Sequence, residues 1–186
     1  MPAASPYLVN VRDLERRPGE LRERELDLNA PDQLGAGAAV VTAGTPVHID
    51  LRLESLHEGI LATGDVDSAA TGECVRCLDS VSVPVRVEFQ ELFAYSDDEA
   101  FDYRVRDDHV DLEPVVRDAV VLSLPFQPVC RPDCPGLDPA TGEKLADDPE
   151  QRPAAIVDPR WAALEGFAPV ASGIDGGDAV AEEEKR

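Results

Sequence analysis

The sequence has little positive charge. Its 17 lysine and arginine residues stand against 38 aspartate and glutamate residues, which gives a formal net charge of −21, and only Lys144 and Lys185 are lysine. Proteins that bind DNA grooves gain affinity from cations that replace phosphate counterions, and anionic membranes attract basic segments. The composition therefore excludes a broad cationic surface for DNA or for membranes, and any contact with bare nucleic acid must be local or indirect.

Long hydrophobic runs are also missing. The longest uncharged stretch, residues 35–49, is broken by glycines, threonines and Pro46, and it falls short of the roughly 20 apolar residues that a spanning helix needs. The first residues lack the basic start and apolar core of a secretory signal. We expect a cytoplasmic protein with one domain over residues 1–165, followed by a flexible acidic tail at residues 166–186.

No motif of a common enzyme class is complete. His57 and Glu58 begin a zinc-protease pattern, but Leu61 stands where its second histidine belongs. Residues 65–67 begin like a calcium loop, yet Ala70 occupies the position of the turn glycine. The sequence also lacks a phosphate-binding glycine loop, a nucleophile elbow and a dinucleotide fingerprint. We therefore expect a protein that is not an enzyme.

Alternating apolar and polar residues predict a mainly antiparallel sheet of about five strands. The clearest alternation covers residues 47–54 and 81–90. A weaker candidate at 60–66 is interrupted by Gly64, and shorter candidates at 7–11 and 22–28 are separated by a turn at 17–20. Pro84 cannot donate to a ladder, so the strand at 81–90 should lie at an edge there or turn that position outward.

One segment changes from a strand period to a helix period. Apolar residues recur at i, i+3, i+4, i+7 and i+8, which is the stripe of a helix packed on a core: Leu112, Val115, Val116, Ala119 and Val120. Asp111 is the expected N-cap, and Pro125 should end the helix. The expected fold class is therefore α+β, with one principal helix across the sheet.

All four cysteines occur in two closely spaced pairs. Cys74 and Cys77 lie between two predicted strands, and Cys130 and Cys134 follow the predicted helix. Two such turns can complete the tetrahedral shell that zinc prefers in structural sites, and a four-thiolate shell leaves no open position for a water molecule. The spacing predicts one structural zinc ion in a zinc-knuckle-like site.

Two other interpretations of the cysteines remain open. In the first, Cys74 and Cys77 form a redox dithiol, although such a dithiol needs a helix N-terminus to lower the thiol pKa and a strand is predicted to follow here. In the second, the cysteines only pack as small apolar residues. The close pairing of all four in a reducing compartment favours metal over both.

Several segments together resemble one known family, the YceD family of large ribosomal RNA subunit accumulation proteins, in its actinobacterial form. The resemblance runs from about residue 7 to residue 164 and rests on six segments: residues 58–64, 72–78, 91–93, 117–125, 130–137 and 158–164. It implies that the four cysteines are the metal-type cysteines of the family. This sequence departs from many relatives at Asp138 and Thr141, which stand where those relatives have two further cysteines.

The resemblance implies a cytosolic, non-enzymatic factor needed for the synthesis, processing or stability of large-subunit ribosomal RNA. It also implies a gene that often neighbours the gene of a small ribosomal protein. Two roles remain open: action on precursor ribosomal RNA, or an acidic escort for a basic large-subunit ribosomal protein, which opposite charges would favour. A thiol oxidoreductase is a third alternative.

Candidate residues for RNA or partner contact are two arginines that flank the predicted metal turns, two further arginines and the only tryptophan. Together they could form one basic and aromatic spot despite the global charge. They are Arg76, Arg117, Arg131, Arg160 and Trp161. A structural role competes with this interpretation for each residue, because tryptophan commonly docks a segment onto a core and arginine commonly pairs with a carboxylate.

Overall fold

The computed structural model describes residues 5–97, 101–148 and 160. Trp161 and the predicted tail at 166–186 lie outside these residues, so both stay predictions. The described elements are β1 (Leu8–Asn10), β2 (Leu21–Asn29), β3 (Ala39–Val40), β4 (Pro46–Ser55), β5 (Gly59–Glu73), β6 (Ser80–Ala94), β7 (Tyr103–Arg104), β8 (His109–Asp111) and α1 (Glu113–Ser123).

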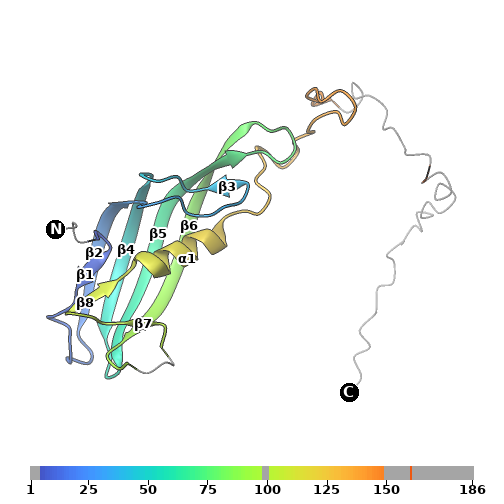
Figure 1. Cartoon of the computed structure of the whole chain (residues 1–186). Helices are drawn as coiled ribbons and strands as arrows, with labels where there is room; N and C mark the ends of the chain where they lie inside the picture. Colours follow the sequence, from blue (N-terminus) through green and yellow to red (C-terminus); the bar gives the residue numbers. More distant parts are fainter. Residues whose placement is uncertain (1–4, 98–100, 149–159, 161–186) are drawn as a thin grey trace, which may run out of the picture.

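The strands form one large, mostly antiparallel sheet in the order β2-β4-β5-β6-β7, with β3 added beside β5 (Figure 1). Only the short β6–β7 pair is parallel. Strands β1 and β8 form a separate two-stranded sheet. This architecture confirms the α+β class. The short strands β3, β7 and β8 were not predicted, because two or three residues are too few to display a period.

Strands β5 and β6 are longer than their sequences predict. The alternation indicates a strand only to about residue 66, whereas β5 continues to Glu73 and pairs along its whole length with β6. The final residues of β5 are small or polar and have weak strand preference, so pairing with the valine-rich β6 imposes the strand. Gly64 does not interrupt β5, because the Phe89 ring lies over it, where an added Cβ would come within 2.5 Å of a ring carbon.

Pro84 lies where the sequence predicts it can be tolerated. On one side β6 pairs with β5, and Pro84 stands opposite Ala69. On the other side, in the described part of the chain, β6 pairs with β7 only at Phe93 and Ala94. Pro84 therefore belongs to an edge, where its missing N–H leaves no ladder bond unmade.

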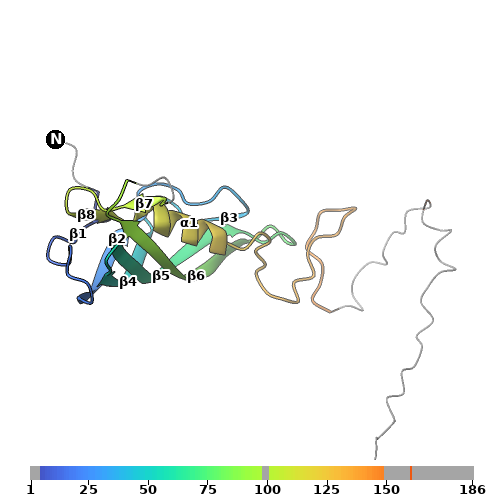
Figure 2. The same cartoon turned by 90° about the horizontal axis from the view of Figure 1, so that it is seen from below.

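Helix α1 covers one face of the sheet (Figure 2). It begins one residue later than predicted: Leu112 is the N-cap position, but the carboxylate of Asp111 still accepts a hydrogen bond from the Glu113 N–H at 3.0 Å. The helix ends at Ser123, and Leu124 is extended. Pro125 accounts for this end, because the residue before a proline is driven out of the helical region.

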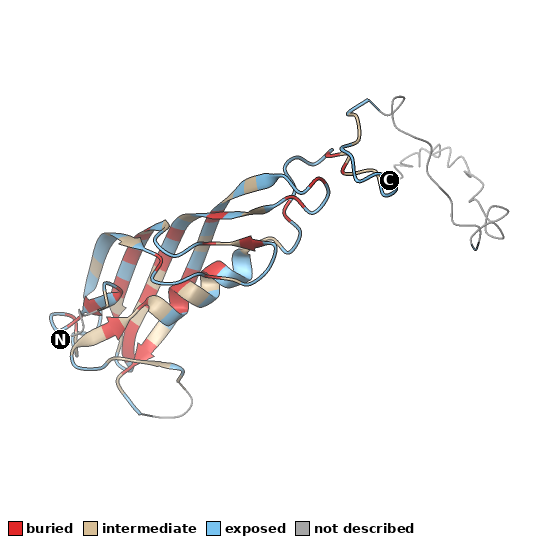
Figure 3. Cartoon of the chain, turned by 45° about the horizontal axis from the view of Figure 1, so that its top comes forward, coloured by how far each residue is buried: buried red, intermediate tan, exposed pale blue. Residues whose placement is uncertain are grey.

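The hydrophobic core lies between α1 and the sheet. Val115, Val116 and Val120 of α1 are buried there together with Ile49 and Ile60 of the strands. Buried and exposed residues alternate along the strands (Figure 3). None of the elements in the described residues covers the opposite face of the sheet (Figure 2). Among the helices of those residues, none has both the length and the apolar character to span a bilayer.

Candidate metal centre

The two cysteine pairs lie at the end of the molecule where the β5–β6 hairpin closes. The last register pair of the hairpin is Glu73 opposite Ser80, so Cys74 and Cys77 occupy its tip, as predicted. The chain that leaves α1 runs to the same end and brings Cys130 and Cys134 beside the tip (Figure 1). A hydrogen bond from the Val75 N–H to the Pro128 carbonyl, at 3.0 Å, joins the two segments.

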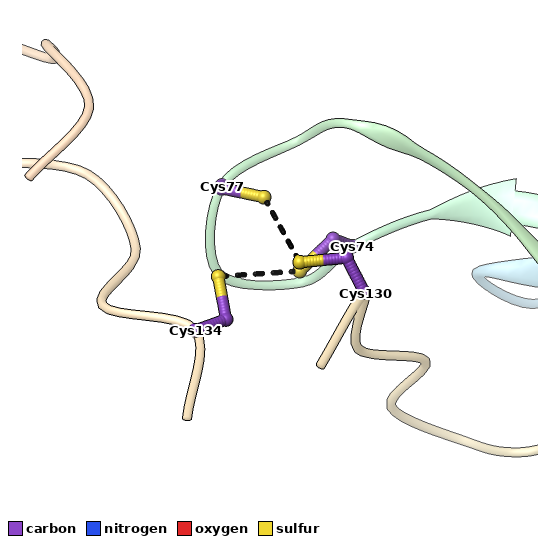
Figure 4. Close-up of side chains that lie close together, drawn as sticks. All are labelled: Cys74, Cys77, Cys130 and Cys134. Carbon is purple, nitrogen blue, oxygen red and sulfur yellow. Dashed lines mark hydrogen bonds between the residues drawn. The ribbon is translucent and has the colours of Figure 1, made fainter. Parts of the chain in front are cut away.

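The four thiol groups point toward one another (Figure 4). All four sulfur atoms lie within 4.8 Å of one another. The Cys74 and Cys134 sulfurs are 3.9 Å apart, and the Cys77 and Cys130 sulfurs are 3.7 Å apart. These separations are far longer than a disulfide bond of about 2.05 Å, and all four cysteines are free thiols.

The sulfur spacing fits one tetrahedral metal ion. Four ligands at a Zn–S distance of about 2.3 Å stand about 3.8 Å from one another at the corners of a tetrahedron. The two measured distances lie on either side of that value. Cys74, Cys77 and Cys134 are buried and Cys130 is exposed. The donor set therefore suits zinc in a closed site, with all four positions filled by protein.

The surroundings of Cys74 and Cys77 shift their thiol pKa values in opposite directions. Burial raises the pKa of Cys74, but N–H donors from Cys130, Cys77 and Arg76 outweigh it and lower the pKa to about 6. The N–H of Asp79 lowers the pKa of Cys77, yet burial and the three neighbouring thiols outweigh it and raise the pKa to about 12. Backbone donors therefore favour the thiolate of Cys74, whereas burial and the neighbouring thiols disfavour the thiolate of Cys77.

Arg76 has a positioning role that its sequence position does not reveal. Its Nη1 donates to the carbonyl oxygens of Pro132 and Cys134, each at 3.0 Å. Gly136 makes this approach possible: its φ is +85°, and a Cβ there would stand 3.1 Å from the Arg76 carbonyl oxygen. The first cysteine turn therefore holds the second one through a side chain, independently of any metal.

An ion pair between Lys144 and Asp79 also joins the two cysteine segments, and the sequence patterns do not predict it. The Lys144 ammonium donates to both carboxylate oxygens of Asp79, at 2.5 and 2.8 Å, and this contact lowers the pKa of Asp79. Asp79 Oδ2 also accepts from the Cys77 thiol at 3.6 Å. Leu137 and Lys144 form an isolated bridge, which folds the segment after Cys134 back toward the hairpin tip. Asp79 and Lys144 are 65 residues apart in the sequence, so no local pattern predicts their contact.

Of the other predicted contact residues, Arg131 and Arg117 have described partners. Arg131 pairs with Asp133 at 3.3 Å and also with Asp147, beside the cysteine cluster. Arg117 lies on α1 and pairs with Glu113 at 2.9 Å and with Asp32 at 3.7 Å. Arg160 is exposed. Trp161 lies outside the described residues, so contact with RNA or a partner stays a prediction for this group.

The segment that follows the first cysteine pair bears on the redox alternative. A reactive thiol of thioredoxin type stands at a helix N-terminus, which favours its thiolate. Cys77 is followed instead by β6, and Leu78 between them has a left-handed backbone with φ of 60°. The observed turn directs N–H groups toward the Cys74 sulfur, which is the arrangement that a metal thiolate requires.

One family model and several uncharacterized bacterial proteins match the sequence. The model described as Large ribosomal RNA subunit accumulation protein YceD matches residues 62–168, which include all four cysteines. The uncharacterized protein Rv2926c of Mycobacterium tuberculosis is 46% identical over 168 residues, 87% of this chain and 81% of the relative. The uncharacterized protein YlbN of Bacillus subtilis is 34% identical over 97 residues, 50% of this chain and 56% of the relative. No solved structure matches the sequence.

Proposed function

Because the chain belongs to the YceD family, the large ribosomal RNA subunit accumulation proteins, we propose that it is a non-enzymatic cytoplasmic factor that supports the synthesis, processing or stability of large-subunit ribosomal RNA. The family is associated with ribosome biogenesis and is not a family of enzymes. The observation that carries the proposal is the family match over the hairpin, the helix and both cysteine turns.

The cysteine cluster supports a role as a scaffold within this function. A closed shell of four thiolates has no position for a substrate or an activated water molecule. The ion proposed for it is one structural zinc, held by Cys74, Cys77, Cys130 and Cys134, and its task is to fix the two turns against each other. Elemental analysis of protein purified without chelator should give one zinc per chain. Freely titratable thiols and far less than one zinc would contradict this assignment.

Depletion of the protein tests the proposed role in ribosomal RNA. The expected result is a lower ratio of mature to precursor large-subunit RNA, with the ratio for small-subunit RNA as the internal control. Re-expression of the natural chain should restore the ratio, and re-expression of Cys74→Ser should not. Unchanged ratios after depletion would contradict the proposal.

A second candidate role is the escort of a basic ribosomal protein of the large subunit. The net charge of −21 favours it, because a polyanion attracts a basic ribosomal protein and mimics its RNA ligand. The two roles differ in their partners. Capture of a ribosomal protein that survives nuclease and is released by salt would favour the escort, whereas loss of every partner after nuclease would favour direct action on precursor RNA.

A further inference from the structure

The face of the sheet opposite α1 carries a concentration of acidic residues. Where β2, β4, β5 and β6 lie side by side, alternation and register put eight carboxylates and only two guanidinium groups on this face. We call this surface the open face. Its charged residues are Glu23, Glu25, Asp27, Asp50, Arg52, Glu54, Asp65, Asp67, Arg86 and Glu88.

Four of these carboxylates form a continuous row across the sheet. Glu25 stands opposite Asp50, Asp50 opposite Asp65, and Asp65 opposite Glu88. All four residues are exposed. Neighbouring strands are about 4.8 Å apart, so the row spans about 14 Å. Like charges directly opposite each other destabilise a sheet, and here the opposition is repeated in three consecutive pairs.

In the neighbouring row of Asp27, His48, Asp67 and Arg86, each carboxylate contacts a basic side chain. His48 contacts Asp27 at 2.8 Å, and Arg86 contacts Asp67 at 3.0 Å. In the acidic row, Asp50 has only a 3.4 Å contact with His48 Nε2. Within the part of the chain that the structure describes, Glu25, Asp65 and Glu88 form no ion pair. The fold therefore retains a repulsive row that a cationic partner would relieve.

The shape and the remaining residues of the open face suit a polypeptide. A shallow depression lies over its centre. Its lining has four carboxylates and two guanidinium groups: Glu23, Arg24, Glu25, Asp50, Leu51, Arg52, Thr63 and Asp65. Two rows beyond the acidic row, Leu21 and Leu61 flank Glu54 on the same face, and Leu92 stands next to Leu61. Leu21 is 43% exposed. Acid beside exposed aliphatic surface offers contacts to both the charged ends and the apolar stems of lysine and arginine side chains.

We propose that the open face is a docking surface for a lysine- and arginine-rich segment of a partner protein. The segment lies across the strands, and its cations contact the row formed by Glu25, Asp50, Asp65 and Glu88. RNA does not fit this surface, because its phosphates would meet eight carboxylates. The inference deepens the escort role proposed above by naming the surface and the chemistry of its partner, and it rests on that role.

The test measures binding of a fluorescent 12-residue peptide of alternating arginine and alanine to the whole chain at an ionic strength of about 0.1 M. The face variant carries Glu25→Gln, Asp50→Asn, Asp65→Asn and Glu88→Gln. The control variant removes the same number of charges elsewhere: Asp102→Asn, Asp107→Asn, Asp118→Asn and Glu143→Gln. We expect the face variant to bind at least about tenfold more weakly and the control less than about threefold more weakly, because screening limits exposed charges to a range of about 10 Å.

Thermal melting separates binding from folding in the same proteins. The face variant should melt at a temperature equal to or higher than the natural chain, because its repulsive row is gone. Equal peptide binding by the natural chain and the face variant would overturn the proposal, as would equal losses in both variants. Binding of a single-stranded RNA that the peptide displaces and that the face variant loses would also overturn it, because RNA would then occupy the open face. Failure of the depletion experiment alone would reject the ribosomal RNA role and leave peptide binding intact.

Discussion

The hairpin β5–β6 joins two regions that are stabilised in different ways. At its base, Ile60 and Phe93 stand opposite each other, both are buried, and the Phe93 ring lies 5.5 Å from the ring of Tyr103. At its tip, the apolar cluster among the described residues consists of three buried cysteines and the partly buried Val81. The base is therefore stabilised by apolar burial, while the tip has too little apolar surface to fold in this way.

Polar contacts also stabilise the tip, which has little buried apolar surface, but most of these contacts are exposed to solvent. Lys144 and Asp79 are both more than half exposed, and Arg131 reaches exposed carboxylates. Exposed ion pairs contribute little to stability, typically less than about 1 kcal/mol each. The comparison indicates that the proposed metal ion would supply, at the tip, the stability that the hydrophobic core supplies at the base.

Of the changes considered, removal of the metal should produce the largest difference in stability between the tip and the base of the hairpin. Structural zinc sites contribute on the order of 10 kcal/mol to folding, so a strong chelator should unfold the cysteine turns and leave the sheet intact. In hydrogen exchange, the amides of Val75, Leu78 and Leu145, which are hydrogen-bonded at the tip, should lose protection. The amides in the middle of β5 should keep theirs, and added zinc should reverse the change. Equal loss in both regions would show that metal and sheet form one folding unit.

A core substitution should produce the opposite pattern. Phe93→Ala removes a ring that is 1% exposed, and such truncations cost about 3 to 5 kcal/mol. We expect a lower midpoint of denaturant unfolding for the sheet and an unchanged zinc content in the chains that remain folded. Leu122→Ala is the matched control, because Leu122 is 85% exposed. Zinc loss from folded Phe93→Ala would contradict the separation of the two regions.

Leu78 offers a way to strengthen the tip alone. Its φ of 60° is left-handed, which costs a residue with a side chain about 1 kcal/mol, and its side chain is 60% exposed. Leu78→Gly should therefore slow the loss of zinc to a competing chelator by up to about fivefold. Val75→Gly is the control: Val75 has no left-handed backbone, and its replacement should hasten zinc loss. Faster loss from Leu78→Gly would mean that its exposed side chain contributes contacts at the tip.

The smallest expected effect concerns the pH dependence of the sheet. The hydrogen bond to Asp27 raises the pKa of His48, with a further contribution from Asp50. A raised pKa stabilises the folded state fully below the ordinary histidine value of about 6.5, and this contribution is lost as pH rises through the raised value. Asp27→Asn should lower the pKa of His48 in an NMR titration, whereas Asp118→Asn on α1 should leave it unchanged. An unchanged pKa in Asp27→Asn would show that the pair is not formed in solution.

Local patterns predict much of the fold and the ligands of the centre. Alternation predicts β4 and most of β6, the helix period predicts α1, and Pro125 predicts its end. The far half of β5 could not be predicted, because its residues have weak preferences and its partner strand determines its structure. The pairing of cysteines is visible in their spacing, whereas the roles of Arg76 and Asp79 are not, because their contacts come from distant segments.

The sequence by itself determined the chemistry of this protein: four thiols in two pairs, a helix between them and a large excess of acid. These properties depend on residue type and short spacing, which the chain carries whether it is folded or not. Only the tertiary structure decided where this chemistry lies. Strand register aligned Glu25, Asp50, Asp65 and Glu88 in one row, and the path of the chain after α1 brought Cys130 and Cys134 to the hairpin tip. Register and chain path follow from burial of the whole core, which no local segment specifies.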